Sequence, residues 1–167
     1  GSVTWTSGKM GNALEFDAAS VQLPIAAHPP SSDNQFSIAF WAYGNPDKLP
    51  VSTSIIESKR GNNRVINMHW PWSNGRMYWD VGDGGVDRIE KNSVPADYEG
   101  RWTHWVLTNN KNPRSMRIYM DGVEWFSRTD RGRNWGAADT WYLGANRNGN
   151  GSWWYGKVDD LRVYNVE

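Results

Sequence analysis

The segment 64–81 holds residues whose types suit the recognition of a sugar. If this segment forms an antiparallel hairpin, successive side chains point to opposite faces, and Asn67, His69, Tyr78 and Asp80 then share one face. Amide, imidazole and carboxylate groups hydrogen-bond hydroxyls, and an aromatic ring packs against the C–H face of a sugar. The pattern predicts a saccharide site on this face of the sheet.

Two residues outside the strands extend this predicted site. Trp72 follows Pro71 in the connecting turn, where a large ring is difficult to bury. Arg88 follows a glycine-rich stretch, and its guanidinium would suit the carboxylate or sulfate of an acidic sugar. The residues predicted to bind ligand are Asn67, His69, Trp72, Tyr78, Asp80 and Arg88. The alternative is an ordinary solvated sheet face, and a register slip of one residue would exchange the two faces.

The acidic residues do not form a recognisable catalytic pair. Glu15 and Asp17 lack a third carboxylate nearby, and Asp83, which is close to Asp80, falls in a glycine-rich turn. A glycosidase needs two carboxylates held at a fixed separation. Three histidines without any cysteine disfavour a catalytic zinc site, and no phosphate-binding loop is present. The sequence therefore predicts a protein that is not an enzyme.

Short apolar and β-branched runs between Gly, Pro, Asn and Asp clusters predict an all-β protein, because no segment keeps a helical apolar period. The turns at Ser73-Asn74-Gly75 and Asp121-Gly122 predict antiparallel hairpins. Strands are expected over 13–16, 21–23, 36–43, 54–59, 65–70, 77–81, 88–91, 103–108, 116–120, 123–127, 140–144 and 157–164. Such a set favours a two-sheet sandwich.

Length and charge narrow the classes of partner. A chain of 167 residues suits a single domain over 1–167. Lys plus Arg and Asp plus Glu are both 18, so nucleic acid and acidic membranes are not favoured, and no apolar run approaches a membrane span of roughly 18 residues. The opening Gly1-Ser2 is typical of a domain excised from a larger protein, whose export signal would lie elsewhere.

Four parts of the chain together resemble one known family. They are Gly11–Asp17, Phe36–Trp41, Trp102–Thr108 with Ile118–Gly122, and Leu143–Asn165. In this order they resemble the laminin-G-like branch of the concanavalin A-like lectin/glucanase superfamily. The resemblance implies a jelly roll of two antiparallel sheets, found as a module of secreted bacterial enzymes and surface proteins. Its members mostly bind glycans and sometimes proteins.

Taken together, these features predict an extracellular or cell-surface, lectin-like module, a monomer attached to other domains. It would target a parent enzyme or cell to a polysaccharide or oligosaccharide without catalysing a reaction. The alternative is a protein-interaction or structural module of a surface, adhesion or virion protein, because Trp, Tyr and Arg also dominate protein interfaces.

The segment Val158–Tyr164 resembles the last strand of bacterial glucanases in this superfamily, which implies a structural Ca²⁺ with Asp159 as a ligand. Asp17 is expected to close the site, since these sandwiches pair their first and last strands. Oxygen ligands suit this ion. The alternative is that Asp159 and Asp160 only cap the strand end or pair with neighbouring basic residues.

The sequence contains 12 Trp and 7 Tyr against 4 Phe, which indicates that some rings work at the surface. The tryptophans expected in the core, at apolar strand positions that match those of the family, are Trp41, Trp79 and Trp102. Trp105 alternates away from Trp102 and is expected to line the concave face of the sandwich. For Trp135 and the pair Trp153-Trp154, a sandwich edge and a sugar platform remain equal alternatives.

Overall fold

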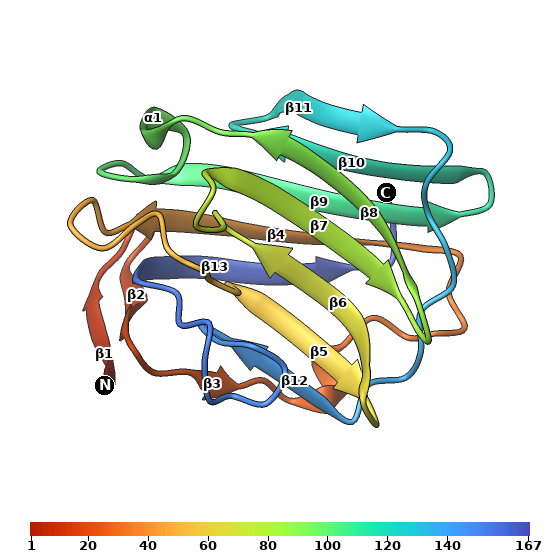
Figure 1. The fold of residues 1–167 in the computed structure, drawn as a ribbon, viewed down its shortest axis with the longest axis horizontal. Coiled ribbons are helices and arrows are strands. Elements are labelled where there is room, and N and C mark those ends of the chain that lie inside the picture. The colour runs from red at the N-terminus through yellow and green to blue at the C-terminus, as the bar shows by residue number, and fades with distance from the viewer.

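Two antiparallel sheets pack face to face in the computed structural model, which describes residues 1–167 (Figure 1). The predicted all-β sandwich is therefore confirmed, and its architecture is consistent with a jelly roll. The structure contains no helix that is long and apolar enough to cross a membrane.

The seven-stranded sheet has the order β1-β2-β13-β4-β9-β10-β11. Its strands are β1 (Ser2–Ser7), β2 (Asn12–Asp17), β13 (Gly156–Tyr164), β4 (Gln35–Gly44), β9 (Thr103–Lys111), β10 (Arg114–Met120) and β11 (Val123–Arg128). The six-stranded sheet, which lies in front in Figure 1, has the order β3-β12-β5-β6-β7-β8. Its strands are β3 (Val21–Gln22), β12 (Thr140–Leu143), β5 (Ile56–Arg60), β6 (Asn63–His69), β7 (Arg76–Gly82) and β8 (Val86–Asn92). Two short helices, η1 (Ile25–Ala27) and α1 (Pro95–Tyr98), lie in connections.

All twelve predicted strands are present, with shifts of a few residues at their ends. Strand β1 was not predicted, because its sequence Ser-Val-Thr-Trp-Thr-Ser is mostly polar and it is an edge strand that pairs only with β2. The turn between β10 and β11 is the predicted one. Asp121 and Gly122 have φ values of 51° and 82°, as a two-residue hairpin turn of the left-handed type requires.

The core lies between the sheets and joins them through both packing and hydrogen bonds. A cluster of 26 buried residues fills the space, including Trp79, which was predicted there. The indole N–H of Trp79 in β7 donates to the carbonyl of Thr108 in β9 at 2.9 Å, so this ring links the two sheets. The indole N–H of Trp154 likewise donates to the carbonyl of Trp70 at 2.8 Å.

The predicted faces of three other tryptophans were wrong. Phe40 and Ala42 point into the core from β4, so Trp41 between them points to the outer face of the seven-stranded sheet. Trp41 pairs with His104, and Trp102 lies on this same outer face beside Tyr43. Trp105 is fully buried in the core instead of lining the concave face.

Most of the tryptophans whose location the sequence does not decide lie in the core. Trp135 is buried, and its indole N–H donates to the carbonyl of Pro29 at 3.1 Å. Trp154 is also buried, whereas Trp153 is half-buried. Neither Trp135 nor Trp154 is therefore available as a sugar platform.

Candidate functional site

The six residues predicted to bind a ligand come together around strands β6, β7 and β8. In the pairing of these strands Asn67 is opposite Asp80, His69 is opposite Tyr78, and Asp80 is opposite Arg88. The pairing of β6 with β7 has no bulge, so alternation places them as predicted on the outer face of the six-stranded sheet. The alternate residues Ile66, Met68, Met77, Trp79 and Val81 are fully buried in the core.

Asp80 is the centre of a hydrogen-bonded network and is itself fully buried. Its two carboxylate oxygens accept bonds from Nε and Nη2 of Arg88 at 2.6 and 2.7 Å. Arg64 Nη1 donates to Asp80 at 3.0 Å, and the amide of Asn67 donates at 3.1 Å. Because Asn67 is also fully buried, neither residue is a surface contact for a ligand. Asp80 holds Arg64 and Arg88, and Asn67 holds Asp80.

A second buried carboxylate, Glu57 of β5, belongs to the same network and was not predicted. It accepts bonds from Arg64 Nε at 2.9 Å, Arg147 Nη1 at 3.2 Å and the hydroxyl of Ser54 at 3.0 Å. An acidic residue directly after Ile55-Ile56 is the sequence signal for it, because a buried charge requires a partner. Arg147 comes from the loop after β12, so local sequence gives no sign of this contact.

Three aromatic side chains lie beside this network. The rings of His69 and Trp72 have centroids 4.2 Å apart, and the His69 and Tyr78 rings are 5.8 Å apart in an edge arrangement. The guanidinium of Arg88 lies 4.7 Å from the centre of the Tyr78 ring. Trp72 and Tyr78 are half-buried, so each ring is held in place and still presents surface. This arrangement suits a sugar ring.

Burial lowers the pKa of His69, and its contact with the Thr53 carbonyl opposes this shift. The Nδ1 atom lies 2.5 Å from that carbonyl oxygen, which can only accept, so Nδ1 carries the proton of a neutral ring. Nε2 is then the acceptor nitrogen of the ring. His69 therefore adds a hydrogen-bond acceptor to a surface where the arginines supply donors.

The two predicted calcium ligands do not form one site. Strands β2 and β13 pair as expected, but their register places Phe16 opposite Gly156. Asp17 and Asp159 are therefore about four residue steps apart along the ladder, roughly 13 Å. Asp17 is exposed, and one oxygen of Asp159 accepts the Met10 backbone N–H at 2.8 Å. No group of three His, Cys, Asp or Glu is arranged to hold a metal. Calcium binding at Asp159 stays a prediction.

The outer face of the seven-stranded sheet carries a second group of rings, here called the outer aromatic patch. It consists of Trp41, Tyr43, Trp102 and His104, all half-buried. The Trp41 and His104 centroids are 4.9 Å apart, and the Tyr43 and Trp102 centroids are 5.8 Å apart. Ammonium groups cover two rings, with Lys9 lying 4.9 Å from Trp41 and Lys157 lying 5.8 Å from Tyr43. This patch is on the opposite side of the sandwich from Asp80.

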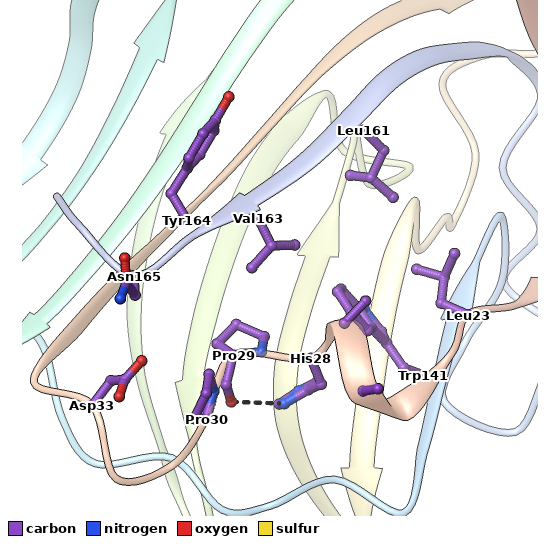
Figure 2. Close-up of a pocket in the computed structure, with 12 residues that line it drawn as sticks. Leu23, His28, Pro29, Pro30, Asp33, Trp141, Leu161, Val163, Tyr164 and Asn165 are labelled. Atoms are coloured by element: carbon purple, nitrogen blue, oxygen red, sulfur yellow. Dashed lines mark hydrogen bonds between the residues drawn. The ribbon is translucent and has the colours of Figure 1, made fainter.

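A cavity of about 570 Å³ lies between the segment that follows η1, strand β12 and the end of β13. Figure 2 shows Leu161 and Val163 of β13 on one side of it, with Trp141 and His28 on the other. Its lining is mainly apolar. Hydroxyl-rich ligands need polar partners, so this cavity suits a saccharide less well than the β6–β8 face.

His28 in the wall of this cavity makes folding stability depend on pH. Its Nδ1 donates to the Pro29 carbonyl at 3.1 Å (Figure 2). Its Nε2 lies 3.0 Å from the hydroxyl of Ser58, which suits a neutral ring. Burial lowers its pKa from 6.5 to about 4. Between these pH values the unfolded chain binds a proton that the folded chain does not, so stability falls as the pH falls.

We expect this histidine to contribute a loss of about 3 kcal/mol in the free energy of unfolding between pH 7 and pH 4. Urea denaturation at a series of pH values measures it. A His28→Gln variant should lose this part of the pH dependence, whereas His69 and His104, whose pKa values burial also lowers, keep a smaller dependence of the same sign. Identical pH profiles for the two proteins would contradict the assignment.

Comparison with solved structures identifies relatives of the whole fold. Domain 4 of AbnA, an extracellular arabinanase from Geobacillus stearothermophilus solved with arabinotriose, has a TM-score of 0.73 and 23% identity over 98% of this chain and 75% of that one. The CBM40 module of a Ruminococcus gnavus sialidase, bound to sialyllactose, has a TM-score of 0.67 and 11% identity over 92% and 90% of the two chains.

The binding domain of botulinum neurotoxin serotype G has a TM-score of 0.71 and 15% identity, and the match covers 99% of this chain but 42% of the toxin domain. All three identities are low, so these likenesses show the fold alone. No curated protein sequence matches significantly. The sequence model of the laminin G family, described as concanavalin A-like lectin/glucanases superfamily, matches residues 17–167. The chain belongs to the concanavalin A-like lectin/glucanases superfamily.

Proposed function

We propose that the protein is a non-catalytic carbohydrate-binding module that holds a polysaccharide on the outer face of its six-stranded sheet. The observation that carries this proposal is the half-buried pair Trp72 and Tyr78 beside the arginine network on β6–β8. The rings pack against the C–H face of a sugar, while guanidinium donors and the neutral His69 acceptor hydrogen-bond its hydroxyls.

The relatives support this proposal at the level of the fold. Two of the solved structures contain a bound oligosaccharide, arabinotriose in one and sialyllactose in the other. Both are parts of larger enzymes, and the arabinanase is extracellular. We infer that this chain has a similar place, as a module that targets a secreted parent enzyme or a cell surface to its polysaccharide.

The charges of the site support binding rather than catalysis. A general acid or nucleophile must contact its substrate, but Asp80 and Glu57 are both buried and fully engaged by arginines and neighbouring polar groups. The more exposed Glu90 pairs with Arg76. These carboxylates position cations and leave no free pair for hydrolysis.

Replacement of Trp72 with alanine should weaken binding to the recognised polysaccharide about 10-fold, because the sugar loses its stacking surface while the core is untouched. Affinity gel electrophoresis against a panel of arabinans, galactans, xylans, glucans and pectins measures this, with a chelator in a parallel series. Trp5→Ala is the matched control, since Trp5 is 73% exposed on β1 of the other sheet. Equal retardation of the wild type and Trp72→Ala would exclude this site. Loss of binding in the presence of chelator would indicate that a bound metal ion such as calcium is required for polysaccharide recognition.

The outer aromatic patch favours a second candidate function, that of a protein-interaction module. Trp and Tyr side chains grouped on a sheet face are typical of interface hot spots. The toxin binding domains of the same fold belong to proteins that attach to receptors. If this function is correct, Trp41→Ala abolishes capture of a protein partner and Trp72→Ala does not.

A further inference from the structure

The network on the six-stranded sheet contains more positive than negative groups. The charged side chains follow one another across the sheet, from the loop after β12 to β8, in the order Arg147, Glu57, Arg64, Asp80 and Arg88. Each buried carboxylate therefore lies between two guanidinium groups. Three cations therefore face two anions. The side chains of the carboxylates are at most 1% exposed, whereas those of Arg64, Arg147 and Arg88 are 24%, 35% and 39% exposed. The solvent-facing layer is cationic.

These arginines keep donors that the network does not use. Arg64 donates through Nε and Nη1, and Arg88 through Nε and Nη2, which leaves one Nη group free in each. The guanidinium of Arg147 makes a single hydrogen bond, from Nη1 to Glu57. Its Nε and Nη2 together form a free guanidinium edge, the geometry that pairs with both oxygens of a carboxylate.

A cavity of about 360 Å³ opens where Arg64 and Arg147 meet. Its lining residues are Asn62, Asn63, Arg64, Gly85, Val86 and Arg147, none of which is acidic. The two carboxylates nearest in sequence are both paired. Asp87 is bonded to Arg114 at 2.6 Å, and Asp83 is bonded to Arg60 at 2.9 Å and to the Asn63 amide at 3.2 Å. Such a cavity offers hydrogen-bond donors on several sides and little repulsion for an anion.

This cavity and the aromatic residues lie on one continuous face. Arg64 and His69 are both in β6, five residues apart, which corresponds to roughly 15 Å along the strand. Between them Asp80 and Arg88 link the cavity to the Tyr78 ring. An oligosaccharide can therefore contact the rings with one sugar and the cavity with another.

We propose that this cavity binds the carboxylate of an acidic sugar, so that the natural ligand is a polysaccharide containing uronic-acid-type residues. The inference rests on the proposed function and adds the class of sugar. The carboxylate of the acidic sugar pairs with the free edge of Arg147 and accepts a further hydrogen bond from Arg64. Hydroxyls on the preceding sugars contact Arg88 and His69 beside the rings.

Isothermal titration calorimetry with matched charged and neutral polymers tests this proposal. The probes are polygalacturonate and alginate, the esterified form of each, neutral arabinan, and dextran sulfate. We expect at least one polyuronate to bind about 10-fold or more tightly than its ester. Arg147→Gln should remove this preference. Arg162→Gln is the control, because Arg162 is an exposed arginine of β13 in the other sheet, paired with Asp160.

The outcomes separate this inference from the proposed function. One outcome is that arabinan binds the wild type but not Trp72→Ala, and that neither polyuronate binds more tightly than its ester. This result would overturn the acidic-sugar assignment and still support the proposed carbohydrate-binding function. Dextran sulfate binding as tightly as the polyuronates would overturn the choice of carboxylate. Absence of binding to every probe would overturn both.

Discussion

Replacement of Asp80 with alanine is expected to lower the free energy of unfolding by about 3–5 kcal/mol. Asp80 is fully buried and takes four hydrogen bonds, two from Arg88, one from Arg64 and one from Asn67. Removing the carboxylate leaves the part-buried guanidinium of Arg88 without its counter-charge, takes one of two carboxylate partners from Arg64, and leaves the buried amide of Asn67 without its acceptor. Such uncompensated groups are among the largest single-residue costs in proteins.

Urea denaturation followed by circular dichroism measures this loss. Asp130→Ala is the matched control, because Asp130 also pairs with arginines, at 2.6 Å from Arg128, but at an exposed site. Exposed ion pairs contribute at most about 1 kcal/mol, so this variant should remain close to the wild type. A similarly small effect of Asp80→Ala on the free energy of unfolding would show that the hydrogen bonds to Asp80 contribute little to stability. The proposal that the buried carboxylates position the arginines would then fail.

Replacement of Trp105 with alanine should also cost about 3–5 kcal/mol, through a large cavity in the core. Trp105 is fully buried, and its ring makes edge contacts with Trp70 at 4.8 Å and with Trp125 at 5.6 Å. Its indole N–H has no hydrogen-bond partner. Trp105→Phe should therefore cost much less, since it fills most of the space and removes an unpaired donor.

Trp41→Ala provides the comparison, because sequence patterns place Trp41 in the core and the structure places it on the outer aromatic patch. The same denaturation experiment should show a smaller loss for Trp41→Ala than for Trp105→Ala. The reverse order would mean that the two faces of β4 and β9 are exchanged. Binding of polysaccharide should be unaffected by Trp41→Ala if the β6–β8 face is the site.

The success with β6–β7 and the error with β4 and β9 have one physical origin. Strand alternation says which side chains share a face, and it does not say which face is inside. In β6–β7 the two sets of side chains differ strongly in polarity. Ile66 and Met68 on one face are apolar, whereas Asn67 and His69 on the other are polar. At β9, Trp105 belongs to one set, and Trp102, directly before the strand, belongs to the other. Because tryptophan is both apolar and able to hydrogen-bond, polarity does not decide between the two sets.

The parts of the site that sequence reasoning missed depend on contacts between distant segments. Arg147 is 90 residues from Glu57, and only the folded sheet brings the loop after β12 over β5. The expected calcium pair shows the same limit. The predicted pairing of the strand that holds Asp17, β2, with the last strand is correct, but its register places Asp17 away from Asp159. Register is fixed by packing across the sandwich, which no single strand reveals.

Nuclear magnetic resonance titration of the labelled protein with the polysaccharide selected by the binding panel tests the central claim most directly. The indole N–H signals of the tryptophans and the Nε–H signals of the arginines report each face separately. The proposed function predicts that signals of Trp72 and Arg88 shift with ligand while those of Trp41 and Trp102 stay in place. Shifts confined to Trp41 and Trp102 would instead place binding on the outer aromatic patch and contradict the site on β6–β8.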